Sequence, residues 1–371
     1  MQFVIKRDIL LKSLNYVQGV VEKKNTLPIL SNVLIELKNK KLSIIATDLD
    51  IIFYDEISDV KILTEGSTTT SATILYDILR KISSNSELNF QLKTKDKLSL
   101  KSENSDFNLN CLPTDNFPTF ADDFTSEEIV LNNGKFLKLL NKTKISISND
   151  DTRHYLNGIY LHLTESNGRN FITGVATDSH RLSSSSIEVE KVIEFKSFIL
   201  PRKTVFQLCS LLGENSDQLN LQLGENKVKF NIGNIKLISK VIDGKFPDYK
   251  KVVPQNNQKI LKVDTKDFIN SVERVITVSI DRKEGVKIAL KKDQIELFVN
   301  SSSSGEGKEN LKASYNSEDL TVGFNSRYLL DIASEIKDQK LTMNLNDSVS
   351  PVLIQDNSDT NSYFVIMPMK I

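Results

Sequence analysis

The chain has 371 residues, of which 39% are hydrophobic and 26% charged, a composition typical of a globular protein with two or three domains. No stretch approaches the roughly 18 consecutive apolar residues of a membrane-spanning helix, and Lys6 and Arg7 fall where a signal peptide would be apolar. We therefore expect a cytoplasmic protein. The 48 basic and 48 acidic residues cancel, which argues against a protein that holds nucleic acid by bulk charge alone.

The chain begins with a strand followed by a helix, and this pair returns twice. Residues 3–5 alternate as one face of a strand does, and apolar side chains within 10–17 follow helical spacing. The same pattern recurs at 129–140 and again at 261–275, at offsets of 126 and 132 residues. These offsets have the size of whole domains, because solenoid repeats span only about 20 to 50 residues. The sequence therefore predicts three domains of similar fold.

A second helix is predicted in each repeat, after several short strands separated by polar turns. These helices are expected at 75–82, 205–212 and 329–336. Strands are expected at 31–37, 42–46, 50–63, 88–92, 98–101, 106–111, 158–163, 171–176, 219–223, 227–232 and 236–241. Polar linkers near 117–126 and 254–259 divide the chain into domains 1–126, 127–254 and 255–371. Six helices against antiparallel strands make an α+β fold.

Two other features are given a structural interpretation only. The serine run 301–304, followed by Gly-Glu-Gly at 305–307, predicts a mobile loop. Cys111 and Cys209 lie in different repeats without metal-type spacing, so we expect buried thiols.

Basic residues gather on some of the predicted helices. The segment 132–148 carries four lysines and no acidic residue, and Lys138 and Lys142 lie four residues apart on one helix face. Arg202 and Lys203 open another helix. These side chains are candidates for contacts with nucleic-acid phosphates, and the alternative is an ordinary solvated helix surface.

The tripeptide Ala-Thr-Asp occurs at 46–48 and again at 176–178, at homologous positions of two repeats. Thr and Asp side chains at a strand end readily accept hydrogen bonds from turn amides, so we interpret the motif as a structural turn. An alternative is a metal-dependent nuclease or nucleotidyltransferase that uses Asp48 and Asp50, which point the same way on a strand. The second repeat does not duplicate that pair.

A hydrolase that uses Asp178, Ser179 and His180 is a further alternative. Consecutive strand residues point in alternating directions, so they are poorly placed to act as orienter, nucleophile and base. The sequence has no phosphate-binding loop and no HExxH zinc motif. We expect a protein without catalytic residues, metal or cofactor.

Seven segments, in order along the whole chain, resemble one family, the beta subunit of bacterial DNA polymerase III, or beta sliding clamp. The matching segments are 26–32 (TLPILSN), 46–48 (ATD), 153–158 (RHYLNG), 176–182 (ATDSHRL), 200–203 (LPRK), 246–249 (FPDY) and 365–369 (VIMPM). The resemblance implies two chains of three clamp-type domains that close head to tail into a ring around duplex DNA. Such a ring is a non-catalytic processivity factor that tethers the polymerase and raises its effective concentration at the primer end.

The resemblance also implies a pocket for short partner peptides that carry a Gln and a Leu-Phe-like end, as in the polymerase, the clamp loader and repair proteins. Its positions are Leu156, Thr177, Ser179, His180, Arg181, Leu182, Pro247, Lys251, Val252, Tyr328, Val349, Val365, Ile366, Met367, Pro368 and Met369. The implied DNA-facing positions are Lys24, His154, Tyr155, Arg202 and Lys203. In the implied homodimer, Phe107 and Leu109 of one copy meet Thr277 and Val278 of the other.

The chain departs from the family pattern at several of these places. Ser179 stands where Gly is common, Lys251 where Arg is, and Pro351 where a small polar residue is. A specialised clamp that serves repair or drug resistance is an alternative within the same family.

Overall fold

The computed structural model describes residues 1–22, 26–118, 122–189, 195–213, 218–279 and 285–370. It separates into two compact units. Unit 1 comprises residues 1–137 and 203–241, and unit 2 comprises residues 138–202 and 242–371. The division passes through the second repeat, so each unit contains a complete outer repeat together with part of the central one. None of the described helices is long and apolar enough to span a membrane.

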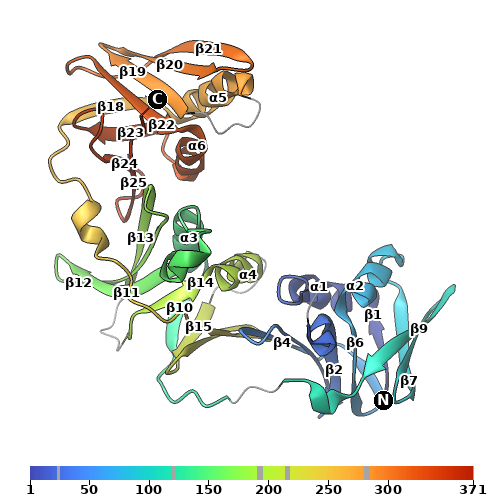
Figure 1. Cartoon of the computed structure of the whole chain (residues 1–371). Coiled ribbons are helices and arrows are strands. Elements are labelled where there is room, and N and C mark those ends of the chain that lie inside the picture. Colours follow the sequence, from blue (N-terminus) through green and yellow to red (C-terminus); the bar gives the residue numbers. More distant parts are fainter. Residues whose placement is uncertain (23–25, 119–121, 190–194, 214–217, 280–284, 371) are drawn as a thin grey trace. The chain divides into compact units, whose positions relative to one another are not determined.

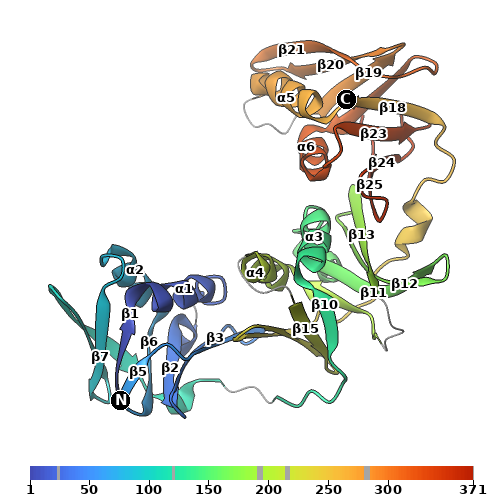
Figure 2. The same cartoon turned by 180° about the vertical axis from the view of Figure 1, so that it is seen from behind.

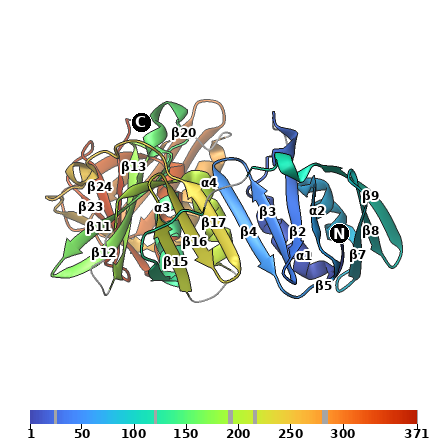
Figure 3. The same cartoon turned by 90° about the horizontal axis from the view of Figure 1, so that it is seen from below.

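Unit 1 is built on one 13-stranded sheet in the order β10-β15-β16-β17-β4-β3-β2-β6-β9-β8-β7-β1-β5. Its elements are β1 (Gln2–Lys6), α1 (Arg7–Val17), β2 (Asn32–Lys38), β3 (Lys41–Thr47), β4 (Ile51–Ile57), β5 (Lys61–Thr64), β6 (Gly66–Ser71), α2 (Ala72–Lys81), β7 (Glu87–Thr94), β8 (Lys97–Ser102), β9 (Ser105–Leu112), β10 (Ile129–Asn132), β15 (Gln218–Leu223), β16 (Lys227–Ile232) and β17 (Ile235–Lys240). The first and second repeats join where β4 pairs with β17, which lie side by side in Figure 3.

Unit 2 contains an eight-stranded sheet, β14-β11-β12-β13-β25-β24-β23-β18, and a four-stranded sheet, β21-β20-β19-β22. Its elements are β11 (Gly158–Ser166), β12 (Arg169–Thr177), β13 (Arg181–Val189), β14 (Phe198–Pro201), β18 (Lys259–Asp264), α5 (Thr265–Val275), β19 (Gly285–Lys291), β20 (Gln294–Ser301), β21 (Gly305–Lys312), β22 (Leu320–Asn325), α6 (Ser326–Glu335), β23 (Lys340–Leu345), β24 (Val352–Asp356) and β25 (Ser362–Ile366). Helices α3 (Asn133–Lys144) and α4 (Arg202–Leu212) have residues in both units. Figure 1 shows α5 against β20 and β21, where Phe268 and Val272 enter the core.

The predicted strand-and-helix pairs are confirmed at all six places. They are β1 with α1, β6 with α2, β10 with α3, β14 with α4, β18 with α5, and β22 with α6. In four of these pairs the last strand residue caps the helix by accepting a hydrogen bond from a first-turn amide, and these residues are Ser71, Asn132, Asp264 and Asn325. Such caps satisfy amides that have no partner inside the helix, and they favour the change from strand to helix at these four places.

The structure bears out the loop prediction for 301–307 only in part, since residues 302–304 form an exposed turn whereas Ser301 and residues 305–307 belong to strands. Ser301 pairs with Gly305 across a tight turn, and β20 and β21 form a regular hairpin on either side of it. Gly307 is required there, since a Cβ atom on it would lie 2.9 Å from the carbonyl oxygen of Val275 at the end of α5. Gly307 therefore allows the hairpin to pack closely on the helix. Of the two thiols expected to be buried, Cys111 is buried and Cys209 is partly exposed.

Strand β13 was not predicted from the sequence. Its middle is four consecutive serines, Ser183–Ser186, so that part lacks both the apolar alternation and the β-branched residues of a typical strand, and β-branched residues occur only near its end, at Ile187 and Val189. Ser183, Ser184 and Ser185 are nevertheless buried. The strand joins the central repeat to the third by pairing with β25, next to which it lies in Figure 2.

Candidate functional site

The duplicated Ala-Thr-Asp motif forms the same turn twice. After β12, the Thr177 hydroxyl donates to the carbonyl oxygen of Arg181 at 2.7 Å, and Asp178 Oδ1 accepts from the amides of His180 and Arg181, both at 2.9 Å. After β3, Thr47 and Asp48 make the corresponding bonds to residues 50 and 51. The motif therefore closes a turn, as the structural interpretation predicted.

The third residue of each turn has a left-handed backbone, with φ of 80° at Leu49 and 76° at Ser179. Glycine adopts this conformation without strain, so Ser179 carries a backbone cost that a glycine would not. Its hydroxyl also accepts a hydrogen bond at 2.6 Å from Arg153 Nη1, and Arg153 Nε donates to Asp150 at 2.9 Å. The turn is thereby tied to the 3-10 helix Asp151–Leu156.

The two carboxylates of the metal hypothesis are engaged with lysines. Asp48 Oδ2 lies 2.5 Å from Lys203 Nζ, and Asp50 Oδ1 lies 3.0 Å from Lys240 Nζ. Among the described residues, no three His, Cys, Asp or Glu side chains are grouped so that they could hold a metal ion.

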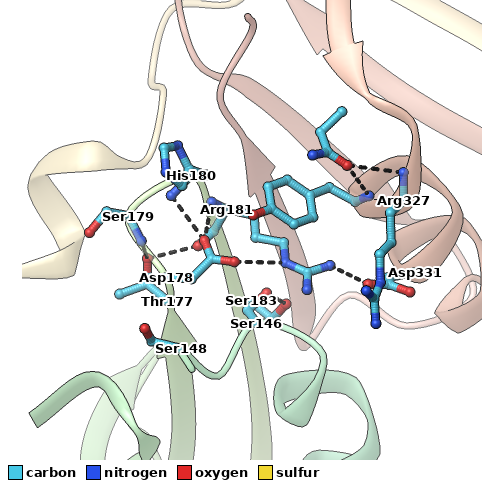
Figure 4. A network of polar contacts seen from close by, with 12 residues as sticks. Ser146, Ser148, Thr177, Asp178, Ser179, His180, Arg181, Ser183, Arg327 and Asp331 are labelled. Atoms are coloured by element: carbon cyan, nitrogen blue, oxygen red, sulfur yellow. Dashed lines mark hydrogen bonds and ion pairs between the residues drawn. The ribbon is translucent and has the colours of Figure 1, made fainter. Parts of the chain in front are cut away.

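Arg181, at the start of β13, is the centre of a polar network that Figure 4 shows. Its side chain is only 9% exposed. Its guanidinium donates to Asp178 at 3.1 Å and to Asp331, on α6, at 2.6 Å. It also lies over the ring of Tyr328, 4.2 Å from the centroid. Two carboxylates and an aromatic face compensate for the burial of this charge and hold β13 against α6.

The apolar part of the candidate pocket comes from separate segments. Leu156, Leu182 and Val365 are buried in one cluster, which also contains Phe246 and Tyr249. Leu182 and Val365 face each other as register partners of β13 and β25.

The outer members of the pocket set expose apolar surface. The relative exposures are 38% for Met367, 40% for Met369, 49% for Val252 and 66% for Val349. The last segment is held by backbone hydrogen bonds, from Met367 N to the His180 carbonyl at 2.8 Å and from Met369 N to the Gly323 carbonyl at 2.9 Å. Soft thioether side chains on a fixed backbone make an adaptable binding wall. Both interpretations of the final segment are thus present, a core strand through Ile366 and exposed methionines after it.

A stack of rings includes members of the buried apolar cluster. Tyr160 stacks on His162 with a centroid distance of 4.6 Å and on Phe246 at 5.0 Å, and His162 Nε2 lies 3.1 Å from the Tyr249 hydroxyl. Burial, helped by the charge of Lys250, lowers the pKa of His162 to about 4. The imidazole is therefore neutral at physiological pH.

Several of the proposed DNA-facing side chains are engaged within the protein, Lys142 and Lys203 most fully. The prediction that Lys142 faces DNA is corrected by the structure. Its side chain is 2% exposed, and its ammonium lies 3.0 Å from Asp356 and 2.9 Å from Asp359. A charge held in this way is not available to phosphates. The ammonium of Lys203 also donates hydrogen bonds within the protein, to Asp48 and to the Val20 carbonyl.

The remaining DNA-facing residues are placed as follows. Lys138 is half exposed and lies 3.0 Å from Asp359. His154 Nε2 lies 3.2 Å from the Asp243 carbonyl, and its ring meets Tyr155 edge to face. Burial and then the charge of Arg327 lower the pKa of Arg202. Lys24 lies outside the described residues.

The four dimer-contact positions differ in exposure. Phe107 lines a cavity of about 490 Å³ beside α2 and the β8–β9 turn, together with Ile74, Ile78 and Ile82. Leu109 is buried. Thr277 is exposed, and Val278 packs partly on the core of its own unit.

Three acidic residues that organise this region were not singled out from the sequence, namely Asp331, Asp356 and Asp359. Each pairs with a base more than a hundred positions away, so only the fold reveals the partner. Asp331 does lie three residues after Tyr328 on one helix, a spacing that places both on the same face.

Comparison with known proteins covers the whole chain. The family profiles of the DNA polymerase III beta subunit match residues 1–121 (N-terminal domain), 130–248 (central domain) and 250–370 (C-terminal domain). The beta sliding clamps of Caulobacter vibrioides and Escherichia coli K12 are 37% and 33% identical over the full length of both chains.

Solved structures agree with this. A Caulobacter crescentus beta sliding clamp, with polyethylene glycol bound at a putative beta-motif tethering region, covers 100% of this chain and 99% of its own, with a TM-score of 0.95 and 37% identity. A Bartonella birtlesii sliding clamp bound to griselimycin covers 100% of both chains, with a TM-score of 0.95 and 39% identity. The chain belongs to the family of the DNA polymerase III beta subunit, the beta sliding clamps.

Proposed function

We propose that this protein is a DNA replication processivity factor, a sliding clamp that encircles duplex DNA and tethers DNA polymerase III without catalysing a reaction. The observation that carries the proposal is that three clamp domains match in order along the entire chain. A ring holds DNA by topology, so strong phosphate contacts are unnecessary and weak ones permit sliding. The zero net charge of the chain agrees with that requirement.

The direct test is retention on DNA of different topology. Protein loaded by its clamp loader should remain on nicked circular duplex during gel filtration and should leave when the circle is cut once. Equal loss from circular and linear DNA would contradict the ring.

We propose that partner peptides bind at the surface around the β13–β25 junction, at the sixteen positions from Leu156 to Met369 implied by the family resemblance. The exposed methionines and valines offer an apolar surface for a Leu-Phe-like end, and the polar turn at 177–181 offers partners for a glutamine. The Bartonella birtlesii sliding clamp is bound to griselimycin in its solved structure, which supports ligand binding by clamps of this fold. Expected partners are the polymerase, the clamp loader and repair proteins.

We propose a homodimer in which the cavity beside α2, where Phe107 and three isoleucines lie among polar residues, receives Thr277 and Val278 of a second copy, with Leu109 on the neighbouring strand β9. Ile74 is 54% exposed at this cavity, which leaves apolar surface for a partner to cover. Each copy would contribute one domain to each contact, so two copies close the ring. The domain limits 1–126, 127–254 and 255–371 are part of this proposal.

We propose that weak DNA contacts come from Lys24, Lys138, His154, Tyr155 and Arg202, with a smaller part for Lys203. The alternative of a metal-dependent nuclease gains no support from the positions of Asp48 and Asp50, because each carboxylate is paired with a lysine.

A further inference from the structure

The sequence of strand β13 leaves its register against β25 weakly specified. Side chains alternate between the two faces of a sheet, so a slip by one residue would exchange the faces of the whole strand. An apolar alternation normally prevents this, but Ser183–Ser186 are all alike. The apolar pattern of β13 therefore specifies its pairing with β25 only weakly.

The pairing matters because the candidate pocket is built across it. Arg181 pairs with Ile366 and Leu182 pairs with Val365. A change of register would separate these partners and turn Arg181 away from Asp331. Something other than the apolar pattern must hold the two strands in place.

A buried ionic cluster lies at the opposite end of the same strand pair. Lys142 projects from α3 into the turn between β24 and β25, where it meets Asp356 and Asp359 at 3.0 and 2.9 Å. The side chains are 2%, 0% and 8% exposed respectively. Lys138, one helical turn earlier, also reaches Asp359 at 3.0 Å.

Every part of this cluster is joined to the strands. Asp359 accepts from the hydroxyl of Ser362, the first residue of β25, at 2.7 Å, and Ser362 bonds to Ser185 of β13 at 2.9 Å. Helix α3 also packs closely on β12 of the same sheet, since a Cβ atom on Gly174 would lie 2.5 Å from Leu139. Ser146, just after α3, bonds to Ser183 at 2.6 Å.

The two carboxylates are charged within this network. Burial opposes the ionisation of Asp356, yet hydrogen bonds from the Lys337 amide, Ser358 and Lys142 hold its pKa below the usual range. For Asp359, burial also opposes ionisation, and hydrogen bonds from Lys142 and Ser362 outweigh it, so that its pKa is lowered as well. A buried ion pair contributes little net stability against an apolar substitute, but it tolerates only one arrangement and can therefore select a register.

We infer that Lys142, with Asp356 and Asp359, sets the register of β25 against β13 and is thereby a positioning residue for the peptide pocket. The inference rests on the proposed function of that pocket. Lys142 itself touches no pocket residue through any of these bonds; it acts through the β24–β25 turn and Ser362.

The test compares Lys142→Met with Lys135→Met, which removes an exposed lysine of the same helix. Two measurements are made on the full chain: titration calorimetry with a Gln-Leu-x-Leu-Phe peptide, and hydrogen exchange of the amides in 181–185 and 362–366. In Lys142→Met the peptide Kd should rise at least about fivefold, a modest coupling between two sites, and exchange should quicken in these two strands but not in β19 and β20. Lys135→Met should change neither.

A second variant keeps the test decisive if Lys142→Met does not fold. Asp359→Asn retains the Lys142–Asp356 pair and should give the same two changes at smaller size. Unchanged peptide affinity, or faster exchange spread equally over unit 2, would reduce the cluster to a general stabilising role and overturn the inference. Failure of the unaltered protein to bind the peptide would instead contradict the proposed pocket, while the exchange measurement would still test the register.

Discussion

Substitution of Met367 by alanine should weaken peptide binding without affecting the fold. The residue follows β25, is 38% exposed, and has its amide fixed to the His180 carbonyl, so its side chain is available while its backbone is held. The exposed part of a methionine of this kind is about 75 Å², and burying it under a ligand is worth about 2 kcal/mol at roughly 25 cal/mol per Å². Alanine would recover part of that area, so Met367→Ala should cost about 1 to 1.5 kcal/mol, or about tenfold in Kd.

The assay is titration calorimetry with a peptide that ends in Leu-Phe. Ile260→Ala is the matched control, since Ile260 is 47% exposed but lies on β18, the last strand of the same sheet and three strands from β25. Thermal unfolding should be nearly the same for both variants. If Met367→Ala binds as tightly as the unaltered protein, or if Ile260→Ala loses as much affinity, the methionine does not form part of the site.

Three further predictions concern the dimer, DNA and pH. Phe107→Asp should give monomers with unchanged circular dichroism, because it places a charge in the cavity beside α2; a variant that still sediments at twice the 41.9 kDa chain mass would move the interface elsewhere. Binding to a short linear duplex should be weak, with a Kd of about 10⁻⁶ to 10⁻⁴ M. Arg202→Gln should reduce the slope of log K against log salt concentration by about one, whereas Lys142→Met should leave that slope unchanged. An equal effect of both variants would show that Lys142 reaches DNA. The pKa of His162 in the folded protein is about 4, below the ordinary 6.5, so its contribution to stability is complete above pH 6.5 and is lost as the pH falls toward 4. The variant His162→Phe should therefore flatten the dependence of the unfolding free energy on pH over that interval. An unaltered dependence on pH would exclude this histidine as its source.

The positions of the helices could be predicted from local patterns alone. In β18 and α5, for instance, apolar residues change from a period of two to helical spacing at Asp264, and that residue also supplies the cap. This change from strand to helix periodicity depends only on neighbouring residues, so it can be recognised in the sequence. Its threefold recurrence indicates the number of similar domains. The Ala-Thr-Asp turns could be predicted for the same reason.

The partners of buried charges were decided by the tertiary structure. Lys142 has the helical position of a surface lysine, and the sequence contains no sign that Asp356 and Asp359, more than two hundred residues later, fold against it. The prediction of a DNA contact was wrong because helical spacing identifies a shared face but not what covers that face. Strand β13 was missed for a related reason. The hydroxyls of the buried Ser183 and Ser185 are satisfied by Ser146 and Ser362, and that of the half-buried Ser186 by Thr173, all of which come from other segments. A polar strand becomes a core strand only when distant residues satisfy its hydroxyls, and that condition exists only in the folded chain.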